Sequence, residues 1–227
     1  MSFDIMLRAV PIVLEGFLVT VTLLVTSFAL GQALALPLAL ARTSKNRWLN
    51  WPVLTFTFIE RGTPLLVQLF IIYFGLAQLE SVRESIFWPL LRDPMPAAIL
   101  AFGLNSAAYS AELLRGALIN IPDGQYEAAK TLGLSRFAMY FRVILPQAYR
   151  DILPVIGNEA ILVLKATALA STVTVMDMTG AARNFTAQTY APFEVFFIAG
   201  IIYLGLSLLL ARAFDELGKR ISVPRHN

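Results

Sequence analysis

Residues 12–40 read IVLEGFLVTVTLLVTSFALGQALALPLAL, and this long apolar run decides what kind of protein the chain is. A helix needs roughly 20 apolar residues to cross about 30 Å of hydrocarbon, and this run exceeds that length. Four further apolar stretches follow along the chain, at 53–79, 96–118, 152–175 and 193–210. We therefore expect an all-α membrane protein with five transmembrane helices.

The composition supports a membrane protein and excludes several kinds of chemistry. Hydrophobic residues make up 57% of the chain and charged residues 15%, and the mean hydropathy is +0.68. A soluble domain carries about 25% charged residues. The chain has no cysteine and a single histidine, His226, so neither a thiol nor a histidine metal site is expected. We expect no catalytic residue, no cofactor and no metal in this chain, and the modest net charge of +3 gives no support to nucleic-acid binding.

The first apolar stretch could instead be a cleavable signal peptide, since Ala33-Leu34-Ala35 resembles a small-residue cleavage site. That alternative is weak, because the stretch is too long for a signal core and its basic cluster follows it instead of preceding it. Gly31, Gln32 and Pro37 also interrupt it, as in a packed transport helix.

The charges of the connections predict an orientation, because lysine and arginine accumulate on the cytoplasmic side of membrane helices. Arg42, Lys45 and Arg47 give the first connection a charge of +3. The connection after the second stretch sums to −1, and the segment 119–151 sums to +1. We expect the N-terminus outside and the C-terminus in the cytoplasm.

The chain lacks the sequence motif of an ATPase. No G-x-x-x-x-G-K-[ST] phosphate-binding loop occurs, so ATP hydrolysis by that route is excluded. A stand-alone secondary carrier usually shows two repeated halves, and five spans without a visible repeat disfavour it. A potassium-type filter sequence is also absent. A carrier, a channel and an assembly subunit without a transport path remain alternatives to a subunit that depends on a partner for energy.

The segment 119–151 predicts two short helices at the membrane surface. Residues 125–132 favour a helix, Gly133 is a natural helix terminator, and Ser135 can cap a second helix over 136–144. We expect that second helix to end before Pro146.

One face of the first of these helices gathers small residues. Tyr126, Ala129, Leu132 and Gly133 recur at helical spacing, and such a face would let another protein approach closely. The alternative is a simple amphipathic helix lying in the interface.

The same segment carries a long spaced pattern. Its members are Glu127-Ala128-Ala129, then Gly133, then Val143-Ile144-Leu145-Pro146. The pattern resembles the EAA motif of the permease subunits of ATP-binding-cassette (ABC) importers, with Val143 as the one conservative departure. Residues 60–66 with Gln68, and residues 108–117, look like the polar amino-acid (histidine/glutamine/arginine) permeases. Residues 165–174 look most like the histidine-type M subunits and their opine-transporting relatives.

The resemblance implies a type I ABC importer permease fold in one domain over 1–227, with a coupling loop at 119–151. It implies that the loop inserts into a separate ATPase subunit, which binds ATP and Mg. The partners it implies are a second permease, identical or homologous, two ATPase subunits and an extracytoplasmic solute-binding protein, in the lipid of the bacterial inner membrane. The cargo it implies is polar, especially basic, amino acids or opines. The coupling residues carried over are Gly124, Tyr126, Glu127, Ala128, Ala129, Leu132, Gly133, Leu145 and Pro146.

Two ionisable residues, Glu159 and Lys165, fall within the fourth apolar stretch, where charge is costly. At about 100° per residue they lie about 120° apart around a helix and cannot face each other squarely. The resembling family places its translocation cavity between two permease subunits, with the fourth span in its wall. One hypothesis is that Glu159 contacts a cationic group of the substrate and Lys165 a carboxylate. The alternative is that both pair with other charges to hold spans or subunits together.

Two further features near the membrane boundary favour structural roles. Glu112 and Arg115 are three residues apart and can pair on one helix face. Pro64 predicts a kink within the second apolar stretch, which could serve as a gate or merely as a turn.

Overall fold

The computed structural model describes residues 2–221, so Arg225 and His226 lie outside the described residues. Within that range the chain is helical and contains no β-strand. The elements are α1 (Phe3–Glu15), α2 (Phe17–Thr43), α3 (Arg47–Gly62), α4 (Leu65–Phe70), η1 (Ile71–Gly75), η2 (Leu76–Gln78), α5 (Glu80–Arg83), α6 (Trp88–Leu91), α7 (Pro94–Asn120), α8 (Asp123–Thr131), α9 (Arg136–Met139), η3 (Tyr140–Ile144), α10 (Leu145–Thr167), η4 (Ala168–Val173), α11 (Met178–Thr189) and α12 (Pro192–Ile221).

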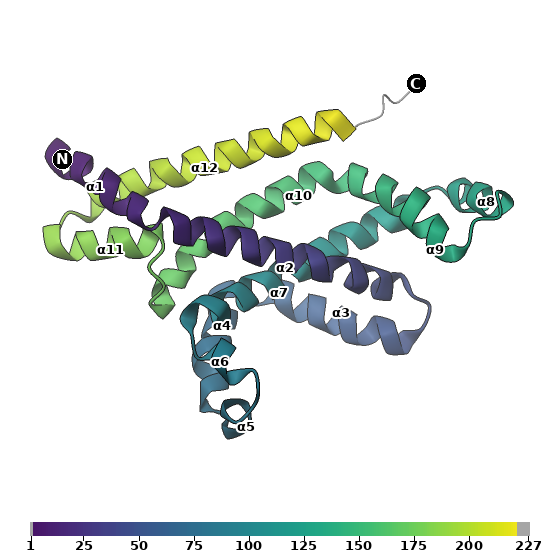
Figure 1. The fold of residues 1–227 in the computed structure, drawn as a ribbon, viewed down its shortest axis with the longest axis horizontal. Coiled ribbons are helices and arrows are strands. Elements are labelled where there is room, and N and C mark those ends of the chain that lie inside the picture. Colours follow the sequence, from purple (N-terminus) through teal and green to yellow (C-terminus); the bar gives the residue numbers. More distant parts are fainter. Residues whose placement is uncertain (1, 222–227) are drawn as a thin grey trace.

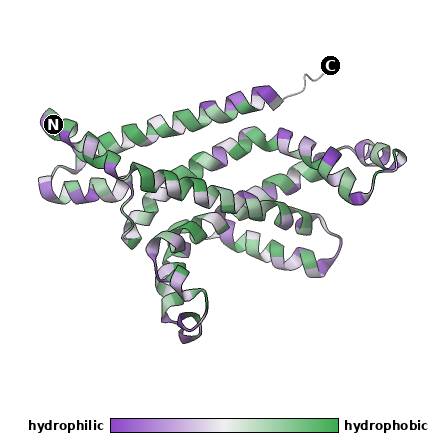
Figure 2. Cartoon of the chain, viewed as in Figure 1, coloured by the Kyte–Doolittle hydropathy of each residue, from purple (hydrophilic) through white to green (hydrophobic). Residues whose placement is uncertain are grey.

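Four described helical segments are long and apolar enough to cross a bilayer: Phe17–Thr43, Pro94–Asn120, Arg136–Val173 and Pro192–Arg220. A fifth crossing results if α3 and the helical segment Leu65–Gln78 count as one span bent by 108°. Hydrophobic residues run along α2, α10 and α12, while hydrophilic residues gather around α5 and the α8–α9 loop (Figure 2).

The centre of the fold is the packing of α2 along α7. A Cβ atom at Gly31 would lie 2.7 Å from the Ser106 Oγ, and one at Gly103 would lie 2.6 Å from Leu30 Cδ2. Small side chains thus allow the two backbones to approach closely, which is how helices gain packing energy in lipid. α10 packs against both α2 and α7, and α12 packs on α10 (Figure 1).

The kink expected at Pro64 is confirmed as a sharp bend, and two side chains explain how the bend is tolerated. A broken helix leaves backbone carbonyls without intrahelical donors. Gln68 Nε2 donates to the Glu60 carbonyl at 2.7 Å and to Thr63 Oγ1 at 2.8 Å. Asn105 Nδ2, from α7, donates to the same Glu60 carbonyl at 2.9 Å.

The first apolar stretch, expected as one helix over 12–40, is interrupted at Gly16, where α1 ends and α2 begins. The physical reason is the close approach of the segment before α11. A Cβ at Gly16 would lie 2.3 Å from the carbonyl carbon of Asp177. Figure 1 shows α1 beside α11 at the end of the molecule far from α8.

The prediction that the second loop helix ends before Pro146 is wrong. The chain stays helical from Arg136 through α10, because a π-helical turn, η3, directly precedes the proline. The wider turn shifts the hydrogen-bond register, so Pro146 occupies a first-turn position of α10, where its missing N–H is not needed.

The contact at Gly16 gives a test of the fold. Replacing Gly16 with alanine should push α11 away from the α1–α2 junction and lower the free energy of unfolding by about 1–3 kcal/mol, a typical cost of overpacking. The measurement is the midpoint of thermal unfolding of the purified protein in detergent. Gly200→Ala in α12, where a Cβ meets nothing within 4 Å, is the control and should leave the midpoint unchanged or slightly raised. Equal midpoints for the two variants would contradict the packing described.

Candidate functional site

Three adjoining clefts follow one face of the protein, formed by α3, α7 and α10. The first has a volume of about 350 Å³ and is lined by Leu65, Phe102, Asn105, Tyr109, Glu159, Leu162, Val163, Lys165, Ala166 and Leu169. The second, of about 340 Å³, shares Tyr109, Glu159 and Leu162 with the first and adds Arg61, Glu112 and Arg115, among others. The third, of about 300 Å³, shares Arg61 and Glu112 with the second. Together they form a mainly apolar track in which a few charged and polar side chains are exposed.

Glu159 and Lys165 both come from α10 and both line the first cleft. Glu159 is buried, with 5% of its surface exposed, whereas Lys165 is exposed. Within residues 2–221 no ion pair joins them, as their angular separation on one helix requires. The cleft therefore presents a carboxylate and an ammonium group at separate points of one wall.

Arg61, at the end of α3, reaches toward the same track from the opposite side. Its guanidinium lies over the ring of Tyr109, 5.3 Å from the ring centroid. The Tyr109 hydroxyl donates in turn to the Arg61 carbonyl at 3.4 Å. The tyrosine thus holds a cation in the second cleft, which Glu159 also lines.

Glu112 is the centre of a charged cluster that joins three helices. Its Oε2 accepts from Arg115 Nε at 2.6 Å, so the two residues expected to pair do contact each other. Its Oε1 accepts from Arg42 Nε of α2 at 2.8 Å and from Thr57 Oγ1 of α3 at 3.3 Å. Asn50 also accepts a hydrogen bond from Arg42 Nη1. One carboxylate therefore ties α2, α3 and α7 together.

Sequence reasoning missed Arg42 as a member of this cluster, because it counted Arg42 only as a loop charge. The structure buries its side chain to 12% exposure. The available signal was its place in the last turn of the long apolar helix α2, where a charge needs a partner.

The α8–α9 loop is closed by a left-handed glycine. Gly133 has φ +72°, which costs other residues about 1–2 kcal/mol but costs glycine nothing. Its N–H donates to the Lys130 carbonyl at 2.9 Å, and the N–H of Leu134 donates to the Ala129 carbonyl at 3.1 Å. This pair of bonds is the Schellman pattern of a helix C-terminus. The Ser135 Oγ accepts from the Ala138 N–H, so the cap expected for the second helix is confirmed.

The structure separates the expected coupling residues into two groups. Four point inward: Tyr126, Ala129, Leu145 and Pro146. The Tyr126 hydroxyl donates to the Leu118 carbonyl at 3.2 Å. Ala129 is 2% exposed, Leu145 is 5% exposed and Pro146 is half-buried. Those exposed to solvent are Gly124, Glu127, Ala128, Leu132 and Gly133. The single face predicted for Tyr126, Ala129, Leu132 and Gly133 is therefore wrong, because α8 turns Ala129 toward the body of the protein.

The inward group fixes the loop to the body of the protein. Burial raises the pKa of the Tyr126 hydroxyl, and nearby Tyr140 and Asp123 raise it further, so the group remains a donor at neutral pH. Ala129 and Leu145 lie in one buried cluster with Leu114 and Ile152 of α7 and α10. The loop is therefore packed as part of the helical frame.

The same loop and the helix that follows it expose large apolar side chains. Leu132 is 78% exposed and Phe137 is 71% exposed. The ring centroids of Phe137 and half-exposed Phe141 lie 4.3 Å apart. The α8–α9 loop therefore exposes apolar side chains within an otherwise polar segment.

A family comparison decides what kind of protein carries this loop and this track. The family described as "binding-protein-dependent transport system inner membrane component" matches residues 31–223. The chain belongs to this family. It is a permease subunit of the ABC importer type, and the resemblance to polar amino-acid permeases is confirmed. Members of the family are the membrane component and are not themselves catalytic.

Curated relatives of the permease carry transport names. It is 47% identical to the octopine transport system permease protein of Rhizobium meliloti, over 94% of this chain and 84% of that protein. It is 43% identical to the histidine/lysine/arginine/ornithine transport system permease protein of Escherichia coli, over 90% of this chain and 87% of that protein.

Solved structures share its fold. The permease matches a chain of an amino acid ABC transporter with a TM-score of 0.83 and 31% identity, covering 97% of this chain and 99% of that chain. A chain from an inward-facing methionine ABC transporter matches with a TM-score of 0.77 at 18% identity, which shows the fold alone. The permease therefore has a type I ABC importer permease fold, as the sequence predicted.

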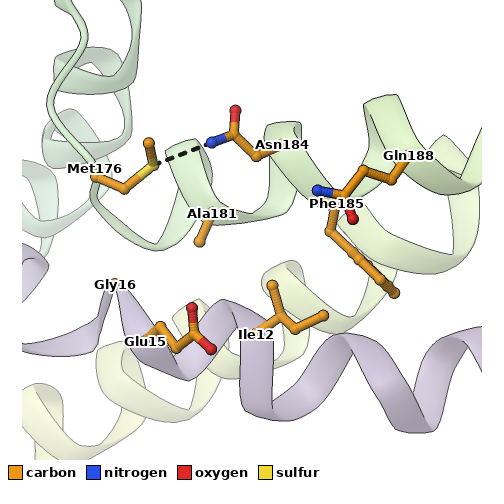
Figure 3. Close-up of a pocket in the computed structure, with 8 residues that line it drawn as sticks. All are labelled: Ile12, Glu15, Gly16, Met176, Ala181, Asn184, Phe185 and Gln188. Carbon is orange, nitrogen blue, oxygen red and sulfur yellow. Dashed lines mark hydrogen bonds between the residues drawn. The ribbon is translucent and has the colours of Figure 1, made fainter.

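A further cleft of about 390 Å³ lies between α1 and α11, at the end of the permease far from α8 (Figures 1 and 3). Figure 3 shows Glu15, Asn184 and Gln188 around it, with Asn184 Nδ2 donating to the Met176 sulfur at 3.6 Å. Within residues 2–221, no group of three or more histidine, cysteine, aspartate or glutamate side chains is arranged to hold a metal ion.

Asp177 anchors this end of the permease. It caps α11 through the N–H groups of Gly180 at 2.9 Å and Thr179 at 3.2 Å, and the Tyr203 hydroxyl of α12 donates to it at 3.0 Å. Burial raises the pKa of this carboxyl, and these hydrogen bonds oppose the rise. Asp177 thus joins the start of α11 to α12.

The Glu112 cluster generates a stability prediction. Glu112→Gln should leave the guanidinium of Arg42 buried without a carboxylate and destabilise the permease by up to about 3 kcal/mol. Glu216→Gln is the matched control, because its ion pairs with Lys219 and Arg220 lie on an exposed surface and contribute less than about 1 kcal/mol. Thermal unfolding in detergent measures both. Equal destabilisation by the two variants would show that Glu112 does not hold the three helices together.

Proposed function

We propose that the permease imports cationic amino acids or opines, with Glu159 receiving the cationic group of the substrate and Lys165 a carboxylate. The observation that carries this proposal is that the two residues line one cleft of about 350 Å³ without pairing with each other. A zwitterionic substrate loses its hydration on entering a membrane, and opposite charges at separate points can replace it. The octopine and the histidine/lysine/arginine/ornithine permeases are named for such molecules.

The cleft is open on one side, which suits a site shared between two permease subunits. Lys165 and Leu162 are exposed, whereas Glu159 lies deep in the wall. In the proposed assembly a second permease, identical or homologous, closes the open side. Arg61 and Arg115 then line the continuation of the track and attract the carboxylate end of the substrate as it moves past Glu159.

We infer five spans, with the bent α3–η2 segment as the second, the N-terminus outside and the C-terminus cytoplasmic. Two observations support this arrangement. The basic connection after α2 and the α8–α9 loop lie toward the same end of the molecule, and α1 and α11 lie toward the other (Figure 1). The end with the excess of lysine and arginine is the cytoplasmic one under the positive-inside rule.

Energy comes, in this proposal, from two ATPase subunits that bind ATP and Mg and dock at the α8–α9 loop of each permease. Exposed Leu132, Phe137 and Phe141 supply the apolar contact, and exposed Glu127 and Gly133 lie beside them. An extracytoplasmic solute-binding protein delivers the substrate at the opposite end, where the α1–α11 cleft offers Glu15, Asn184 and Gln188 as polar contacts.

Charge removal in the cleft tests the proposed substrate contacts. Glu159→Gln and Lys165→Met, each in the complete transporter reconstituted in vesicles, should raise the substrate concentration for half-maximal uptake by roughly 10-fold or more, since a hydrogen bond to a charged group is worth about 1.5–3 kcal/mol. Glu159→Gln should also reduce the preference for cationic over neutral amino acids. Uptake and substrate-stimulated ATPase activity are the readouts.

The matched controls remove the same charges outside the cleft. Glu216→Gln and Lys219→Met alter exposed residues of α12 and should leave uptake unchanged. If an assembled transporter with Glu159→Gln or Lys165→Met kept its normal substrate dependence, the two charges would be structural and the proposed contacts would be wrong.

A further inference from the structure

The first turns of α3 expose an aromatic surface that the transport proposal does not use. Trp48 is 88% exposed and Trp51 is 66% exposed. With Arg47, Pro52 and Thr55 they line a shallow cleft of about 610 Å³. Since residues three and four apart share a helix face, the two indoles and Pro52 form one continuous apolar strip.

Cations without acidic partners lie beside this strip. Of the three basic residues in this connection, Arg42 is held by Glu112, as described above. Lys45 and Arg47 form no ion pair within residues 2–221. Arg42 therefore holds the helices together, whereas Arg47 lines the tryptophan cleft and Lys45 is exposed two residues before it.

The position along α3 matches the boundary of the bilayer. Trp48 and Trp51 follow directly on the polar connection and precede the apolar body of α3. Tryptophan concentrates at this depth, where its ring meets acyl chains and its N–H meets headgroups. Neither indole N–H donates a hydrogen bond within the described residues, so both are available to a ligand.

We propose that this cleft, the Trp48–Trp51 cleft, binds one anionic phospholipid. The acyl chain lies along the two indoles and Pro52, and the phosphate contacts Arg47 and Lys45. Charge complementarity selects this occupant, because an apolar strip that ends at two unpaired cations fits a molecule with an apolar tail and an anionic head.

The permease contains three tryptophans, which makes the site directly observable. When Trp88 and every tryptophan of the partner subunits are replaced by phenylalanine, tryptophan emission reports only Trp48 and Trp51. The assembled transporter is reconstituted in vesicles containing a small fraction of lipid brominated on its acyl chains, either phosphatidylglycerol or phosphatidylcholine. We expect brominated phosphatidylglycerol to quench the tryptophan emission at a lower mole fraction than brominated phosphatidylcholine does, which corresponds to an affinity higher on the order of fivefold or more. The double variant Lys45→Gln/Arg47→Gln should abolish this difference between the two lipids.

Arg83→Gln/Arg92→Gln is the matched control, because it removes two exposed cations from the segment between η2 and α7. The preference for phosphatidylglycerol should survive in it. The reciprocal variant, Trp48→Phe/Trp51→Phe with Trp88 intact, should lose the preferential quenching. Three results would overturn the proposal: no quenching by either lipid, which means that protein covers the cleft; equal quenching by both; or loss of the preference in the control.

Discussion

The close packing of α2 against α7 is the constraint on which the rest of the structure depends. It exists because Gly31 and Gly103 carry no side chain where Ser106 and Leu30 approach. In lipid, where apolar burial between helices gains little, such close contact is the main source of association. α10 packs on this pair, and the Glu112 cluster ties α3 to it, so every wall of the cleft track is positioned by these two helices.

This frame offers a mechanical path from the proposed docking loop to the proposed substrate contacts. Ala129, Ile144 and Leu145 share one buried cluster with Leu114 of α7 and Ile156 of α10. Glu159 lies one helical turn beyond Ile156, and Glu112 is two residues from Leu114. Because packed interiors do not compress, a displacement of the loop would be transmitted to both α7 and α10, which line the track.

The sequence predicted the fold class, the apolar segments and the Pro64 bend, because each depends on local properties of the chain. It missed the break at Gly16 and the continuity through Pro146, since the first depends on Asp177, far away in sequence, and the second on a π turn. It singled out Glu159, Lys165 and Glu112 because charge is conspicuous in an apolar span, and the structure confirms the pairing of Glu112 with Arg115. Arg42 and the inward orientation of Ala129 could not be predicted, because they depend on tertiary contacts.

The central claim of the proposal is that a separate ATPase subunit hydrolyses ATP and docks on this permease at the α8–α9 loop. The chain contains no cysteine, so Leu132→Cys, at a position 78% exposed, introduces a unique thiol there. A thiol-attached photo-crosslinker in the assembled transporter should join the permease to the ATPase subunit, while the same reagent on Leu217→Cys of α12 should give little product. A Leu132→Cys thiol that stays freely reactive toward a soluble maleimide and yields no product with the ATPase would contradict the claim.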